Sequence, residues 1–377
     1  MLITAVTNMK RITVICSFFI FLMLICSACM EDREEKGEYG TSAVDGGYEV
    51  IHLLDGSLMP STEGLLRNVQ EVLYISDYST GYTVPICSRP GCEHKRASAE
   101  NPNPDCYAAY TDIILFATFF DDYLYVFCYS GENHTVVYQS SKTGENRRLV
   151  AECDYVLSGD AVLSLKDGKI FFSEYFEKDG VREENSIYSY REYSLGGFDL
   201  EENSFFELTG ILESGYGYVT LLEVCDGRLY YNCLESDSAD YSAEYFNANR
   251  KTMYLDIESG ETGDITEENS SFYGTDGNLT YWMEKDPETD DYSVYGLAAD
   301  GSRSVIQQGS DAYCFRVFGD LLLTASEITA FPDYVVQGCV QSRILVCDSE
   351  DYTIGVMSVD DFVSGRDEVI WMENPGD

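Results

Sequence analysis

Basic residues are scarce in this chain of 377 residues: 24 Lys and Arg stand against 66 Asp and Glu, a formal net charge of −42. A protein that binds nucleic acid by displacing counterions from phosphates needs a surface of the opposite sign. The composition therefore excludes that class, and we expect no nucleic-acid partner. Such a charge also favours solubility, and we expect the protein to be a monomer.

Proline is also scarce, with 8 residues, whereas hydrophobic residues make up 45% of the chain and aromatic residues 14%. An intrinsically disordered acidic protein has too few apolar side chains to form a core. This chain has enough of them, so we expect a globular protein.

The three histidines, His52, His94 and His134, leave little material for a Ser-His-Asp arrangement, and no G-x-S-x-G nucleophile turn is present. Paired carboxylates for glycoside hydrolysis stay open, because 66 acidic residues form many chance pairs. No residue stands out as catalytic, and an enzyme is the alternative rather than the main hypothesis.

The apolar run Ile12–Ile25 is too short to span a bilayer comfortably as a permanent helix. Lys10 and Arg11 precede it, and Cys26-Ser27-Ala28-Cys29 follows. This arrangement resembles a bacterial lipoprotein signal, in which small residues precede a cysteine that becomes lipidated. It predicts that residues 1–28 are a lipoprotein signal peptide and that Cys29 is the lipid attachment site.

Residues 29–47 contain the lipidated cysteine and a charged, glycine-rich stretch without apolar periodicity. Such a composition is typical of a flexible acidic tether. We therefore expect an exported protein, attached through its lipid to the outer face of the bacterial cell membrane, with one domain over residues 48–377.

From residue 48 onward, apolar strand-like runs recur on either side of short acidic or glycine turns. Asp-Gly between β-rich segments is a strong hairpin signal, because its turn needs positive φ at the central residues. Five such hairpins are expected, at residues 114–129, 161–175, 218–234, 270–284 and 313–326. A second hairpin follows each, at residues 136–150, 192–209, 252–266, 293–307 and 343–358.

Paired hairpins that recur at this interval are typical of the four-stranded blades of a β-propeller. A sixth, less regular unit begins with the strand-like segments at residues 48–54, 73–78 and 83–87. We expect residues 368–373 to supply its missing strand and close the ring. The predicted fold class is all-β, a β-propeller with six four-stranded blades, and seven blades are the alternative.

A Cys/His-rich insertion at residues 87–106 contains Cys87, Cys92, His94 and Cys106. Three thiols and an imidazole can surround a tetrahedral Zn²⁺, and the Pro90-Gly91 turn would direct Cys87 and Cys92 toward one point. A disulfide, Cys87–Cys92 or Cys92–Cys106, is the rival interpretation. A metal ion held by four protein ligands would be structural, because no coordination position remains open.

The insertion also carries a resemblance. Val84, Pro85, Cys87, Pro90, Cys92 and His94, followed by Cys106, Ala108 and Tyr110, form a V-P-x-C-x-x-P-x-C-x-H segment with a downstream C-x-A-Y. The lipoprotein signal at Cys26-Ser27-Ala28-Cys29 and the acidic tether precede this segment. Together these features resemble a family of uncharacterised exported lipoproteins of anaerobic Gram-positive gut bacteria. Members of that family have a low-density-lipoprotein-receptor-like β-propeller domain. The resemblance implies the location and the fold, and it implies no activity.

Tyrosine is abundant, with 30 residues, and aromatic faces at the mouth of a propeller can stack on sugars. Tyr230-Tyr231 and Tyr281-Trp282 are candidates for this role, although tyrosine also fills half-buried sheet faces. We expect a non-enzymatic binding or interaction module with an unknown protein or glycan ligand. The alternative is a glycan-active or other hydrolytic propeller, although the S-x-D-x-G-x-T-W box of sialidase-type propellers is absent.

The lipid anchor gives a direct prediction. The full chain should carry diacylglycerol and partition with membranes, because two acyl chains suffice for stable attachment despite electrostatic repulsion. Cys29→Ala should abolish metabolic labelling with a lipid precursor and move the protein to the soluble fraction. Cys26→Ala is the matched control and should keep the label; labelling that survives Cys29→Ala contradicts the assignment.

Overall fold

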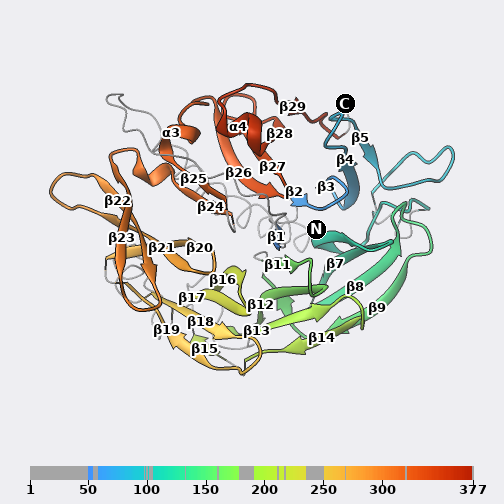
Figure 1. Ribbon diagram of the computed structural model, residues 1–377. Coiled ribbons are helices and arrows are strands. Elements are labelled where there is room, and N and C mark those ends of the chain that lie inside the picture. The colour runs from blue at the N-terminus through green and yellow to red at the C-terminus, as the bar shows by residue number, and fades with distance from the viewer. Residues whose placement is uncertain are drawn as a thin grey trace, which may run out of the picture. The chain divides into compact units, whose positions relative to one another are not determined.

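The chain forms a β-propeller of six four-stranded antiparallel blades arranged in a ring. This computed structural model describes residues 50–53, 58–96, 98, 101, 105–131, 133–158, 161–177, 191–209, 212–215, 218–234, 250–267, 269–318 and 321–375. The predicted signal peptide, Cys29 and tether lie outside the described residues. The predicted all-β class and six blades are confirmed (Figure 1).

The first three blades follow the chain order. Blade 1 contains β2 (Leu58–Pro60), β3 (Leu65–Val69), β4 (Val72–Ser76) and β5 (Thr83–Pro85). Blade 2 contains β6 (Ile113–Phe120), β7 (Tyr123–Gly131), β8 (His134–Ser141) and β9 (Arg148–Cys153). Blade 3 contains β11 (Ala161–Ser164), β12 (Lys169–Glu177), β13 (Arg191–Asp199) and β14 (Ser204–Glu207), extended by β1 (Val50–Leu53), β10 (Val156–Leu157) and β15 (Leu212–Gly215).

The last three blades complete the ring. Blade 4 contains β16 (Tyr218–Cys225), β17 (Arg228–Leu234), β18 (Lys251–Asp256) and β19 (Thr262–Asp264). Blade 5 contains β20 (Ser270–Thr275), β21 (Leu279–Lys285), β22 (Tyr292–Ala298) and β23 (Arg303–Gly309). Blade 6 contains β26 (Tyr334–Val340), β27 (Arg343–Asp348), β28 (Ile354–Ser358) and β29 (Ile370–Trp371).

The predicted fifth unit was divided wrongly. The expected hairpin at residues 313–326 does form, from β24 (Arg316–Phe318) and β25 (Leu321–Leu323), but these two strands make a separate sheet. Val317 packs in the blade 5 cluster and Leu323 in the blade 6 cluster. The hairpin is therefore a wedge between two blades, and the first strand of blade 6 is β26, which the sequence analysis missed.

The segment at residues 48–54 was also misplaced. Its strand β1 does not join blade 1 but pairs antiparallel with β11 of blade 3, from Val50 opposite Ser164 to Leu53 opposite Ala161. It contacts β2, β6 and β26 as well, so it lies where the first strands of several blades meet (Figure 1). The first strand of each blade thus faces the centre of the ring, and β1 occupies that centre.

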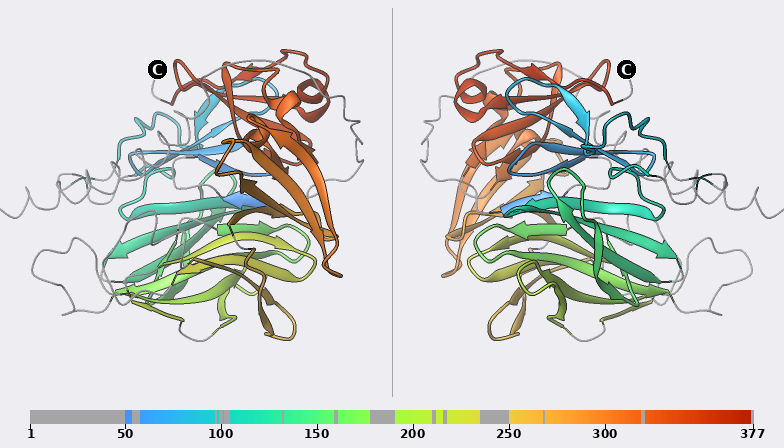
Figure 2. Two further views of the ribbon diagram at one scale, coloured as in Figure 1. Left: turned by 90° about the vertical axis from the view of Figure 1, so that its left-hand side faces the viewer. Right: turned by 90° about the vertical axis from the view of Figure 1, so that its right-hand side faces the viewer.

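The C-terminal segment differs from the prediction. Residues 368–373 were expected to supply a strand to the first unit, but they do not. The strand in this segment, β29, pairs with β28 of its own blade. Glu373 instead joins blade 6 to blade 1: its N–H donates to the carbonyl of Gly81 at 2.9 Å, and its carbonyl accepts from Arg67 at 2.8 Å and Thr83 at 2.7 Å. These hydrogen bonds form a seam between adjacent blades, which lie side by side in Figure 2.

A five-residue turn recurs at hairpin ends. It begins with an aspartate whose carbonyl accepts the N–H of the fifth residue, and this fifth residue has positive φ. The four instances are Asp77–Gly81, Asp256–Gly260, Asp286–Asp290 and Asp348–Tyr352, with φ of 75°, 71°, 66° and 62° at the fifth position. In each, the aspartate carboxylate also accepts backbone N–H groups inside the turn.

These hydrogen bonds stabilise the charged form of the carboxylates. The Ser79 hydroxyl lowers the pKa of Asp77, and the backbone of Ser259 lowers the pKa of Asp256. Part of the large acidic content is therefore used to form turns.

Helix is minor among the described residues. Two short helices, α3 (Ala325–Ile328) and α4 (Val359–Val363), and the 3₁₀ turn η1 (Ala312–Cys314) are present. In the part of the chain that the structure describes, no helix has the length and apolar character required to cross a membrane.

The seam between blades 6 and 1 can be tested at Gly81. Its positive φ disfavours any side chain, and a Cβ there would clash with the carbonyl oxygen of Trp371. Gly260 occupies the same turn position with similar φ but has open space around it. Gly260→Ala should cost about 1–2 kcal/mol from backbone strain, and Gly81→Ala about 1–3 kcal/mol more from overpacking. Equal losses in urea unfolding would contradict the seam.

Candidate metal centre

The four predicted ligands lie in the connection that follows the outer strand of blade 1. This connection leads from β5 to β6, the first strand of blade 2. Cys87, Cys92 and His94 are half-buried and Cys106 is buried. The site therefore lies on the covalent link between two blades.

The ligand atoms of these residues all lie within 4.8 Å of one another, and Cys106 Sγ is 3.6 Å from His94 Nδ1. In a tetrahedral zinc site with Zn–S of about 2.3 Å and Zn–N of about 2.0 Å, neighbouring ligand atoms lie about 3.5–3.8 Å apart. The cluster needs only a small contraction to reach that geometry. The sulfur atoms of Cys87, Cys92 and Cys106 are present as thiols.

Two local features bring the ligands together. Gly91 has φ of 71°, and the N–H of Cys92 donates to the carbonyl of Arg89, which reverses the chain after Cys87. Arg89 also donates to Asp105, to its carbonyl at 2.6 Å and to its carboxylate at 2.9 Å. Cys106 follows Asp105, so this pair holds the last ligand next to the first turn.

Blade 2 supports the cluster from the other side. The Arg147 guanidinium donates to the carbonyls of Cys106, Tyr107 and Ala109 and lies 4.0 Å from the centroid of the Tyr110 ring. A Cβ on Gly144 would lie 2.6 Å from the carbonyl oxygen of Ile86, so the turn after β8 packs tightly on the segment before Cys87.

The sequence analysis missed these supporting residues. Arg89 and Asp105 stand next to the ligands and carry opposite charges, which is the only signal the sequence offered. Arg147 lies 41 residues after Cys106 and gave no local signal.

The thiols differ in their electrostatic environment. Burial raises the pKa of Cys87, but hydrogen bonds with the backbones of Arg89 and Tyr107 and with the thiols of Cys92 and Cys106 together lower the pKa below its ordinary value. Burial raises the pKa of Cys106 to about 12. A metal ion must therefore displace a firmly held proton from Cys106, which makes binding dependent on pH.

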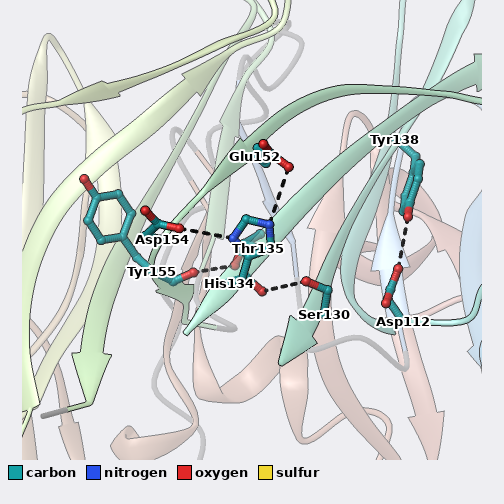
Figure 3. A network of polar contacts seen from close by, with 8 residues as sticks. All are labelled: Asp112, Ser130, His134, Thr135, Tyr138, Glu152, Asp154 and Tyr155. Atoms are coloured by element: carbon teal, nitrogen blue, oxygen red, sulfur yellow. Dashed lines mark hydrogen bonds and ion pairs between the residues drawn. The ribbon is translucent and has the colours of Figure 1, made fainter. Parts of the chain in front are cut away.

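The other two histidines contact carboxylates. His134 lies between two of them, with Nδ1 3.3 Å from Asp154 and Nε2 3.5 Å from Glu152, as Figure 3 shows. His52 Nε2 lies 3.3 Å from Glu223 Oε2. Among the described residues, only the set around His94 has one ligand atom from each of three or more residues within 4.8 Å of one another.

The aromatic residues proposed from the sequence as a sugar platform are part of the core. Tyr230, Tyr231 and Tyr281 are buried and Trp282 is fully buried, so they fill sheet faces, as is common for aromatic side chains. Exposed rings lie elsewhere and include Tyr82, which is 63% exposed, Tyr352 at 66% and Trp371 at 37%.

No protein-family model and no curated protein matches this chain. Solved structures with a similar fold include an oligogalacturonate lyase in complex with manganese, at 12% identity and a TM-score of 0.41, covering 86% of this chain and 89% of that chain. An oligogalacturonate lyase from Vibrio parahaemolyticus has 10% identity and a TM-score of 0.41, covering 83% of this chain and 86% of that chain.

The β-propeller domain of the Trilobed protease from Pyrococcus furiosus is also similar, at 9% identity and a TM-score of 0.37, covering 82% of this chain and 81% of that chain. At this distance the likeness concerns the fold, and it assigns neither ligand nor chemistry to this chain.

The metal centre predicts one zinc ion per chain in protein purified anaerobically, with proton release on binding and a lower Tm after chelation. His94→Ala should weaken zinc binding by at least about 10–100-fold, the loss seen when even a partner of a metal ligand is removed. The matched control is His134→Ala, which removes a histidine held by carboxylates and should leave the zinc content unchanged.

Elemental analysis measures the zinc content, and competition with a chromogenic chelator measures the zinc affinity. Absence of metal from anaerobic protein, or equal effects of the two substitutions, would contradict a Cys₃His centre.

Proposed function

We propose that this protein is a lipoprotein of the outer face of the bacterial cell membrane, anchored through Cys29. Its β-propeller acts as a non-enzymatic binding or interaction module. The sequence supports the location through Lys10-Arg11, the apolar run and Ser27-Ala28-Cys29. The resemblance to exported lipoproteins points the same way.

One observation supports the non-enzymatic part of the proposal. Cys87, Cys92, His94 and Cys106 offer four protein ligands at one point. Zinc is the ion that suits three thiolates and one imidazole in tetrahedral geometry. Such a closed set supports a structural ion rather than a catalytic one, because no position is left for water or substrate. The ion would stabilise the link between blades 1 and 2.

The binding role draws support from the surface. Tyr82, Tyr352 and Trp371 present aromatic rings to solvent, and aromatic side chains are common in contact surfaces for proteins and sugars. His52 and His134 lie against carboxylates, an arrangement that supports a structural use of these side chains.

A binding module and a hydrolytic enzyme differ in what happens to the ligand. Purified chain with Cys29→Ala, which lacks the lipid, should bind saturably to cells that lack this protein, and ligand eluted from the washed complex should have an unchanged mass. Trypsin should remove the native protein from intact cells while a cytoplasmic marker stays intact. Cleaved ligand, or a native chain protected from trypsin, would contradict the proposal.

A further inference from the structure

Three of the four ligands in the Cys/His cluster are thiols, and neighbouring thiols can react with one another as well as bind a metal ion. The sulfur atoms of Cys87, Cys92 and Cys106 lie within 4.8 Å of one another, and all three cysteines are free. A disulfide joins two sulfur atoms at about 2.05 Å, so a pair must approach by less than about 3 Å to form one. The backbone that carries each sulfur decides which pair can do so.

The turn from Cys87 to Cys92 lies at the surface. Residues 88–91 between the two cysteines are all exposed, and both cysteines are half-buried. A Cβ on Gly91 would find no atom within 4 Å, so no neighbour resists a small contraction of the turn at this residue. An external reagent can therefore reach these two thiols, which is a requirement for thiol–disulfide exchange.

Two side-chain contacts tie this turn to its surroundings. The Ser88 hydroxyl donates to Glu145 at 2.6 Å, and Arg89 pairs with Asp105 at 2.9 Å. Both contacts are exposed to solvent, where polar pairs contribute little to stability. They do not prevent the turn from contracting.

Cys106 lies on a covered and firmly held segment. It is 4% exposed, and Ala108 and Ala109 are 1% exposed. The Cys106 carbonyl accepts from Arg147 of blade 2 and from the N–H of Ala109, and the Ala108 carbonyl accepts from the N–H of Leu73 in blade 1. Both blades hold this segment, so Cys106 is the thiol least able to meet a reagent or to move toward another sulfur.

We propose that Cys87 and Cys92 form a reversible thiol–disulfide site, whose oxidation by a low-molecular-weight disulfide expels the metal ion. One cysteine thiolate attacks the external disulfide, which forms a mixed disulfide and releases one external thiolate. The other cysteine thiolate attacks the mixed disulfide and releases the second. The two cysteine sulfurs lose two electrons, which the external disulfide gains. The released thiolates take up the two cysteine protons in the metal-free chain, or protons from solvent in the zinc form.

The oxidised cluster cannot keep its ion. Only His94 and Cys106 remain as ligands, and two ligands do not make a closed tetrahedral site. The cluster therefore has two states, reduced with metal or oxidised without it, and the oxidised state contains the Cys87–Cys92 bridge. Disulfides persist outside the cell, which is the location proposed above. The chemistry itself depends on the cysteines alone and not on the proposed binding role.

The test follows the metal and the bridge together. The full chain, purified anaerobically, is incubated at graded ratios of oxidised to reduced glutathione. A chromogenic chelator measures the released zinc, and alkylation before and after reduction, followed by peptide mass mapping, locates the bridge. Zinc and the Cys87–Cys92 bridge should appear in equal amounts, and excess reduced glutathione should restore zinc binding.

Two substitutions separate the roles of the thiols. Cys106→Ala removes a metal ligand, but its Cys87–Cys92 bridge should form at the same glutathione ratio as in the metal-free parent chain. Cys92→Ala should instead accumulate a stable glutathione adduct on Cys87, because Cys106 does not reach it. Mapping of the parent chain decides the proposal even where a variant does not fold.

Three outcomes would overturn the proposal: a bridge that includes Cys106, a glutathione adduct on the parent chain without a bridge, or zinc that stays bound at the most oxidising ratio. The bridge is also measured in the reduced, metal-free chain. A chain that binds no zinc contradicts the metal centre, whereas a metal-free chain that forms no Cys87–Cys92 bridge contradicts the thiol–disulfide site.

Discussion

The backbone N–H and C=O groups along the inner strands impose the constraint on which the rest of this propeller depends. These groups face one shared channel, and each must be paired, bent away or covered. Bulges bend the edges of four first strands, β6, β16, β20 and β26, and Pro60 shortens the edge of β2. The regular edge of β11 is paired with β1, which lies more than 100 residues earlier in the chain. The ring is thus completed from its centre as well as around its circumference.

The circumference has two reinforced joints on either side of blade 1. The Cys/His cluster brings together distant parts of the connection from β5 to β6. Arg147 holds the end of this connection by donating to the carbonyls of Cys106, Tyr107 and Ala109. On the other side, Glu373 accepts and donates hydrogen bonds across to blade 1. Blade 1 has short strands, so these joints supply the contacts that its own ladder lacks.

Local signals in the sequence predicted local structure well. Three Asp-Gly turns and one Asp-Asp turn located four blades with two hairpins each, because turn residues and flanking strands lie within one short window. Cys87, Cys92, His94 and Cys106 met as expected because they share one connection. The failures concern partners that are distant in the chain: β1 and β11, Glu373 and blade 1, Arg147 and the cluster. For Tyr230 and Trp282, residue type alone could not distinguish a buried ring from an exposed one.

The antiparallel pairing of β1 with β11 gives the ring two unequal faces. The chain enters the channel beside Ser164, at the face where the first strands end in their acidic turns, and leaves beside Ala161, at the face where the first strands begin. The second face bears the connections between blades, including the one from β5 to β6 that contains the cysteines. The two faces therefore differ in chemistry: one carries the acidic turns that end the first strands, and the other carries the thiol and imidazole ligands.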